Sequence, residues 1–389
     1  MPSIASVGPR SIWRRLHRWT AIAAMVLLVP ISLSGALLVW HDALDAMMHP
    51  ARYATTGADA ALPAADYLAS AATALPDDAQ AAALRFPAER GRPVTVTMRA
   101  GAPARPVTVY LDPPTGRVLD VVDFRASLVG ILHRFHENLT IPEYSGRQIV
   151  GWAGAGMLVL SLTGLWLWWP RGGRILAGLR WRRSSATTAN LHHLLGFWIA
   201  LPLAVVSASG IYLAFPQIAR TAMSSVAAMR PQPPRGFGEP VSATALTADR
   251  ALEIARGAAP DMVATAVFVP SRGGGERPRG AAGEARPAPA WRVDLRSAQG
   301  IEIATVMVDD HGGAARRLPD PLAGDRAAQW IRWIHEGSHS GPVWQAVVFL
   351  CGIFPTMLAI TGLVIWLRGR ARRKAGAQAR LAPQLGAAE

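Results

Sequence analysis

The sequence is poor in the residues that build covalent or cysteine-ligated sites. It contains one cysteine in 389 residues, Cys351. One cysteine excludes a disulfide framework, a cysteine-ligated zinc site and an iron–sulfur cluster within a single chain. No Gly-x-Gly-x-x-Gly motif opens a helix after a strand, so the sequence also lacks the fingerprint of a flavin or nicotinamide site.

Charged residues and histidine are absent from four long apolar runs. At a rise of about 1.5 Å per residue, each run is long enough to cross a hydrocarbon core of about 30 Å. The first run is too long for the apolar part of a cleaved signal peptide, and no small-residue cleavage site follows it. We therefore predict four transmembrane helices, over residues 20–41, 149–169, 194–215 and 343–367, the first of which extends one residue beyond its apolar run to His41.

The formal net charge of +14 is concentrated beside the ends of these runs. Residues 1–19 carry four arginines and no acid, residues 170–193 carry five arginines and no acid, and residues 368–389 carry six basic residues against one acid. This distribution follows the positive-inside rule and argues against nucleic-acid binding. It predicts that both termini and the 170–193 loop are cytoplasmic, and that residues 42–148 and 216–342 are periplasmic.

The sequence contains the same pattern twice. A histidine and a later Ser-Gly recur with an offset of 175 residues, and a Thr-Gly dipeptide occurs in the second and fourth apolar runs. This predicts a unit of helix, outside domain and helix, present twice in parallel and related by an axis along the membrane normal. We interpret the dipeptides as packing features. The matching positions are His17 and His192, Ser34-Gly35 and Ser209-Gly210, and Thr163-Gly164 and Thr361-Gly362.

The two long polar segments also resemble each other. Each begins with an alanine-rich amphipathic stretch that predicts a helix, and strand-like runs follow. We predict two small α+β domains, each with one helix against a short antiparallel sheet, and a flexible loop over residues 271–289. The expected helices cover 64–76 and 247–259, and the expected strands cover 93–98, 106–111, 117–122, 262–269, 290–295 and 301–308.

Four histidines occupy matching places in the repeat. His17 and His192 precede the first and third helices, whereas His133 and His335 precede the second and fourth on the outer side. Facing helices that each present an imidazole at one depth can hold haem iron through two axial ligands. The quartet therefore predicts two b-type haems, one near each face of the bilayer.

The choice of ligand stays open within His133/His136, His192/His193 and His335/His339, as does any role of His41. Paired histidines at helical spacing equally suit a zinc or copper ion, although no cysteine or methionine cluster accompanies them. A single histidine at a membrane interface is often only an anchor.

The chain resembles the PepSY-associated transmembrane-helix family of bacterial inner-membrane proteins over essentially its whole length. The motifs that carry the resemblance are Leu16-His17-Arg18-Trp19, Leu132-His133-Arg134, Asn190-Leu191-His192 and Thr361-Gly362-Leu363. The resemblance implies two periplasmic PepSY modules and haem ligation by His17, His192, His133 and His335. A four-residue insertion departs from the family pattern and leaves His136-Glu137 as an alternative to His133.

Some members of this family are iron-regulated, and some are dihaem reductases of ferric siderophores. The resemblance thus implies a haem-dependent electron-transfer protein that reduces a ferric siderophore or another ferric chelate in the periplasm. Electrons would come from a separate donor, a quinol or a reductase protein. The alternatives are a non-enzymatic PepSY sensor or regulatory protein, and a metal-ion carrier.

Overall fold

The computed structural model describes residues 8–101, 105–170, 184–230, 239–241, 243–272, 288–297 and 302–385. Most of the predicted cytoplasmic loop (171–183) and of the predicted flexible loop (273–287) lies outside the described residues. Contacts divide the chain into two units. The helical unit comprises Met1–His41, Ile131–Met229 and Ala323–Glu389, and the sheet unit comprises Asp42–Gly130 and Arg230–Leu322.

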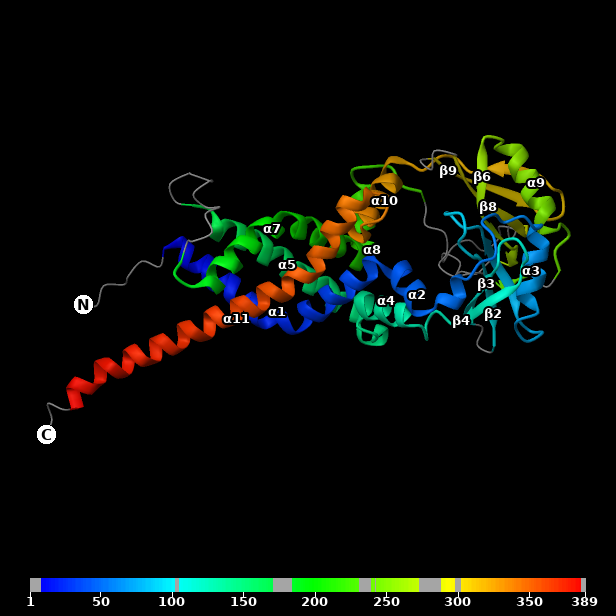
Figure 1. Ribbon diagram of the computed structural model, residues 1–389. Coiled ribbons are helices and arrows are strands. Elements are labelled where there is room, and N and C mark those ends of the chain that lie inside the picture. The colour runs from blue at the N-terminus through cyan, green and yellow to red at the C-terminus, as the bar shows by residue number, and fades with distance from the viewer. Residues whose placement is uncertain are drawn as a thin grey trace. The chain divides into compact units, whose positions relative to one another are not determined.

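Four long helices form the helical unit: α1 (Pro9–Val39), α5 (Gly146–Trp168), α7 (Thr187–Ala214) and α11 (Gly341–Leu385) (Figure 1). Each is long and apolar enough to cross a membrane, and within the described residues these are the four helices that meet this test. They confirm a multi-pass helical membrane protein. Three of them extend beyond the predicted apolar runs by a turn or more at polar ends, where arginine and histidine side chains can reach the interface.

The four helices form a closed ring in which α1 contacts α5, α5 contacts α7, α7 contacts α11 and α11 contacts α1. Small residues allow this close packing. A Cβ atom added at Gly352 of α11 would lie 2.6 Å from the Ala36 Cβ of α1, closer than two carbons can approach. The backbones of these helices therefore touch where glycine and alanine meet.

Shorter helices complete the helical unit: α4 (Leu128–Asn138), η2 (Pro142–Tyr144), α8 (Pro216–Ser224) and α10 (Ala323–Glu336). The sequence placed all of them inside the predicted outside domains, 42–148 and 216–342. Contacts group residues 131–229 and 323 onward with the long helices. The helix α10 packs against α7, and His136 of α4 reaches α1.

The sheet unit contains one antiparallel sheet of eight strands, within the described residues, in the order β10-β9-β8-β6-β1-β2-β3-β4. The first half follows α2 (His41–Met48) and η1 (Pro50–Tyr53). A two-stranded pair, β5 (Glu239–Pro240) with β7 (Ser271–Arg272), stands apart from the sheet. The strands are β1 (Gln80–Arg85), β2 (Val94–Ala100), β3 (Arg105–Leu111), β4 (Val118–Val122), β6 (Met262–Phe268), β8 (Ala290–Ser297), β9 (Ile303–Asp309) and β10 (Ala315–Arg317).

The two α+β modules expected from the sequence are thus joined rather than separate. Strand β1 pairs with β6 over three residues, from Ala83 opposite Phe268 to Arg85 opposite Ala266. The sequence predicted neither β1 nor β10. The alanines of β1 have low strand propensity, and the pairing with β2 and β6 outweighs that local preference.

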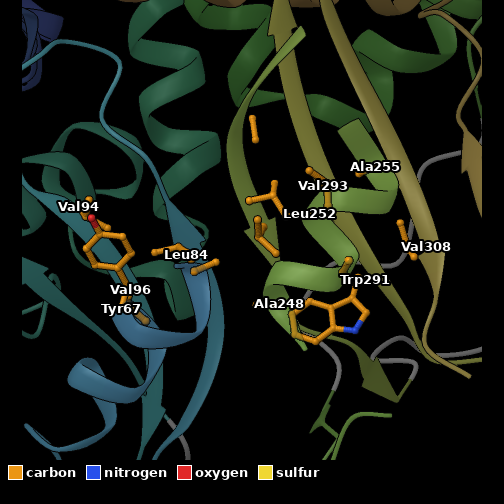
Figure 2. Packing of buried hydrophobic residues seen from close by; sticks show 14 of the residues in the cluster. Tyr67, Leu84, Val94, Val96, Ala248, Leu252, Ala255, Trp291, Val293 and Val308 are labelled. Atoms are coloured by element: carbon orange, nitrogen blue, oxygen red, sulfur yellow. The ribbon is translucent and has the colours of Figure 1, made fainter. Parts of the chain in front are cut away.

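The core of the sheet unit lies between one face of the sheet and two helices, α3 (Ala64–Ala72) and α9 (Ala248–Ala258). Figure 2 shows Tyr67 of α3 over β2, and Leu252 of α9 near Val293 of β8. Asp249 of α9 accepts hydrogen bonds from the Ala64 and Ala65 N–H groups at the start of α3. The two helices therefore share one continuous core.

Candidate functional site

Two histidines from the two halves of the chain meet inside the helical unit. The helix α4 carries His136 to α1, and α10 carries His335 to α7. Their ring centres are 6.1 Å apart, and the ring planes are inclined by 42°. We refer to them as the His136–His335 pair.

The two rings of this pair have equivalent contacts. His136 Nδ1 lies 2.9 Å from the Ile31 carbonyl oxygen and 3.2 Å from Ser34 Oγ. His335 Nδ1 lies 3.0 Å from the Val206 carbonyl oxygen and 3.2 Å from Ser209 Oγ. Each serine hydroxyl also donates to the carbonyl that its histidine contacts.

The glycine after each serine leaves the space that the imidazole fills. A Cβ at Gly35 would lie 2.7 Å from His136 Cε1, and a Cβ at Gly210 would lie 2.8 Å from His335 Cε1. Any larger residue would push the ring away. These Ser-Gly dipeptides look like helix packing features in the sequence, but in the structure they contact and position the histidine rings.

A second pair, His17 and His192, is held by the two Thr-Gly dipeptides. We refer to the Ser-Gly or Thr-Gly dipeptide that contacts each histidine as its seat. His17 Nδ1 of α1 lies 2.9 Å from Thr163 Oγ1 of α5, and His192 Nδ1 of α7 lies 2.9 Å from Thr361 Oγ1 of α11. The glycines that follow, at 164 and 362, face the same rings at 3.4 and 3.3 Å from an added Cβ.

The seats determine which ring nitrogen carries the proton. A carbonyl oxygen only accepts, so the Nδ1 atoms of His136 and His335 must donate. Thr163 donates its own hydroxyl proton to Val159 O (2.6 Å) and therefore accepts from His17 Nδ1. Thr361 donates to Met357 O (2.8 Å) in the same way. All four imidazoles thus keep the lone pair of Nε2 available for a ligand.

The histidines that the sequence left as alternatives lie elsewhere. His133 is exposed, with 56% of its side chain accessible, and its Nδ1 lies 3.8 Å from Glu137. His41 Nδ1 contacts the Leu38 carbonyl, and His339 stacks on Trp333 with ring centres 4.5 Å apart. His193 lies edge-on to His192 at 6.4 Å.

The structure therefore brings His136, and not His133, to His335. In the sequence the decisive signal is the residue that follows, because Glu137 and Glu336 both come directly after the seated histidine. One turn earlier, His133 and Arg332 are equivalent, and each lies beside that glutamate. Aligning the two Glu residues would have selected His136.

A family model described as the PepSY-associated TM region matches residues 14–369. The chain belongs to this family. The matched region of this PepSY-associated protein includes all four seated histidines and both hydroxyl residues of each pair of seats. No curated protein matches the sequence.

Proposed function

We propose that this PepSY-associated membrane protein binds two b-type haems between its paired histidines and carries electrons across the membrane to a ferric siderophore or another ferric chelate. The observation that carries the proposal is the His136–His335 pair, in which each imidazole is hydrogen-bonded through Nδ1 to a helix carbonyl and the ring centres lie 6.1 Å apart.

This spacing would let His136 and His335 bind the same metal ion. A metal–imidazole bond is about 2.0 Å long, so two imidazoles that bind one ion can have ring centres roughly 6 Å apart. Direct packing of two rings would not require both Nδ1 atoms to be anchored to the helix backbone. The observed 6.1 Å therefore supports binding of one haem iron by both histidines.

The number of protein ligands also supports a macrocycle. Among the residues that the structure describes, no group of three or more His, Cys, Asp or Glu side chains is arranged so that it could hold a metal ion. Two histidines alone leave most of the coordination sphere of zinc or copper unfilled. Haem brings four nitrogen ligands of its own, and its iron supplies a one-electron carrier when it is bound.

Two sites at different depths would give a path across the bilayer. His17 and Ser34, which belong to different sites, lie about 25 Å apart in rise along α1. By the positive-inside rule, the basic segments favour a position near the cytoplasm for His17 and His192, and one near the periplasm for the His136–His335 pair. The proposal includes a parallel repeat, with both halves of the sheet unit in the periplasm of a bacterial inner membrane.

The chain would act by holding the imidazoles, excluding water with its apolar helices, and admitting one electron at a time. A quinol or a reductase protein would supply the electrons. One electron converts the ferric ion of the chelate to ferrous iron, which hard oxygen ligands hold less well. The metal would then leave the chelate.

An optical spectrum of the purified full-length protein, before and after dithionite, tests the proposal. We expect a reducible b-type spectrum and about two haems per chain. His136→Ala or His335→Ala should remove one haem and His17→Ala or His192→Ala the other, whereas His133→Ala, the control one turn away, should retain both. A colourless preparation from haem-replete cells would refute the proposal and favour a sensor or metal-ion carrier.

A further inference from the structure

The two histidine pairs are held by different acceptors. At the His136–His335 pair, a main-chain carbonyl at 2.9 or 3.0 Å accepts from Nδ1, and a serine oxygen at 3.2 Å adds a second contact. At His17 and His192, a threonine hydroxyl at 2.9 Å is the acceptor with hydrogen-bond geometry. The carbonyls of Leu160 and Leu358 also interact with these rings.

This difference assigns unequal roles to hydroxyl groups that look alike in the sequence. We propose that Thr163 and Thr361 are positioning residues that orient His17 and His192 and set how strongly these rings donate electrons to bound iron. Ser34 and Ser209 are dispensable for this purpose, because a carbonyl holds each ring without them. The inference rests on the proposed function, since it concerns the ligands of bound haem.

The physical basis is the polarity of the Nδ1–H bond. An acceptor on Nδ1–H raises the basicity of the ring, so Nε2 donates more strongly and the ferric state is favoured. Each threonine is a good acceptor because its own proton is engaged by a helix carbonyl, and chained hydrogen bonds strengthen one another. Without this hydroxyl, His17 or His192 would keep the apolar surroundings of its seat but lose its orienting bond.

Hydroxyl removal at the two pairs of seats gives a matched test. In the purified full-length protein, Thr163→Val with Thr361→Val removes two hydroxyls with little change of shape, and Ser34→Ala with Ser209→Ala does the same at the other pair. Each haem is titrated electrochemically, its ferric form is examined by electron paramagnetic resonance, and its transfer to apomyoglobin is timed.

We expect the threonine double variant to raise the reduction potential of one haem, to shift the resonance of that haem alone, and to speed its release about 10-fold or more. The serine double variant should leave both potentials and both release rates near those of the parent protein. Thr163→Ser with Thr361→Ser should restore the parent values. If circular dichroism shows that the double valine protein is poorly folded, Thr361→Val alone is measured instead. We expect it to change the reduction potential and the release rate in the same direction by a smaller amount.

Equal shifts at the two pairs, or no shift in the threonine variant of a haem-containing protein, would overturn the inference and leave the proposed function standing. A parent protein without haem would overturn both. A threonine variant that loses stability while its remaining haem keeps the parent potential and resonance would show a packing role only, and so would also overturn the inference.

Discussion

The helical unit and the sheet unit differ in the side chains that they bury and expose. In the sheet unit the most buried side chains are large and apolar, such as Tyr67, Leu84 and Met98. In the helical unit large apolar side chains are exposed, with Trp198 at 63% and Leu201 at 68% accessible. Its buried polar residues are mostly small hydroxyl residues: Ser34, Ser161, Thr163, Ser207, Ser209 and Thr361.

This contrast indicates that the two units fold in different solvents, the sheet unit in water and the helical unit in lipid. Water drives the apolar side chains of the sheet unit into one core. Lipid is as apolar as leucine, so the helical unit gains little by burying large side chains and instead uses small residues and hydrogen bonds at its helix interfaces. The same small residues create the seats for the four histidines. In the helical unit, the same small residues therefore serve both helix packing and the positioning of the histidines.

The largest expected effect lies in the core of the sheet unit. Leu84 is fully buried on β1, at the junction of the two halves of the sheet. Leu84→Ala should lower the free energy of unfolding of the sheet unit by about 2–5 kcal/mol, because it leaves a cavity in a close-packed core. Proteolysis of the reconstituted protein across a urea series measures it. Val263→Ala, at an exposed position on β6, should change little. Equal effects would contradict a single shared core.

The second effect separates the two pairs of seats in the helical unit. Gly35→Ala would place a Cβ 2.7 Å from His136 Cε1, whereas Gly164→Ala would place one 3.4 Å from His17 Cε1, an ordinary contact. We expect Gly35→Ala to displace His136 and to remove about one haem per chain. Gly164→Ala should retain both haems. The haem content from a pyridine haemochrome assay measures this, and equal losses would show that the glycines act only through helix packing.

A third effect is a pH dependence confined to the sheet unit. Burial opposes the ionisation of Asp310, but hydrogen bonds from the Ala245 and Leu246 N–H groups and from Trp291 Nε1 outweigh it and lower its pKa. A lowered pKa stabilises the fold above the ordinary carboxyl value of about 4, and this contribution is lost as the pH falls through the lower, native value.

Asp310→Asn should therefore lower the free energy of unfolding at pH 7 by about 1–3 kcal/mol and flatten its decline below about pH 4. Asp59→Asn, at an exposed ion pair with Arg90, is the control and should keep the parent pH profile. The free energy of unfolding of each variant, measured from pH 7 to pH 3, tests this prediction. A profile for Asp310→Asn as steep as that of the parent would assign the acid sensitivity to other carboxylates.

Much of this architecture follows from local sequence properties, and the remainder does not. The membrane-spanning helices follow from uncharged runs of sufficient length, which is a property of one segment at a time. The pairing of Ala83–Arg85 with Ala266–Phe268 joins segments about 180 residues apart, and no local pattern encodes that register. Each seat likewise pairs a histidine with a hydroxyl on another helix, so spacing along one helix could not reveal it.

The choice between His133 and His136 shows the same limit on a smaller scale. Both lie on α4, three residues apart, and only the rotation of that helix against α1 decides which ring reaches the Ile31 carbonyl. The Leu132-His133-Arg134 motif and the family resemblance favoured His133. The position of the neighbouring glutamate favoured His136, and in the structure His136 is the histidine that lies beside His335.

The smallest expected effect tests the solvent argument itself. Leu201 and Leu203 lie two residues apart on α7, and they differ in that Leu201 faces outward whereas Leu203 is buried against other helices. In a bilayer, Leu201→Ala should change the free energy of unfolding by less than about 0.5 kcal/mol, because lipid chains replace the lost methyl contacts and alanine favours the helix. Leu203→Ala should lower it by about 2–5 kcal/mol, because no lipid reaches that position. Titration with a denaturing detergent compares the two. Equal losses would mean that the outward face of α7 packs against protein, and the contrast between the two units would then fail.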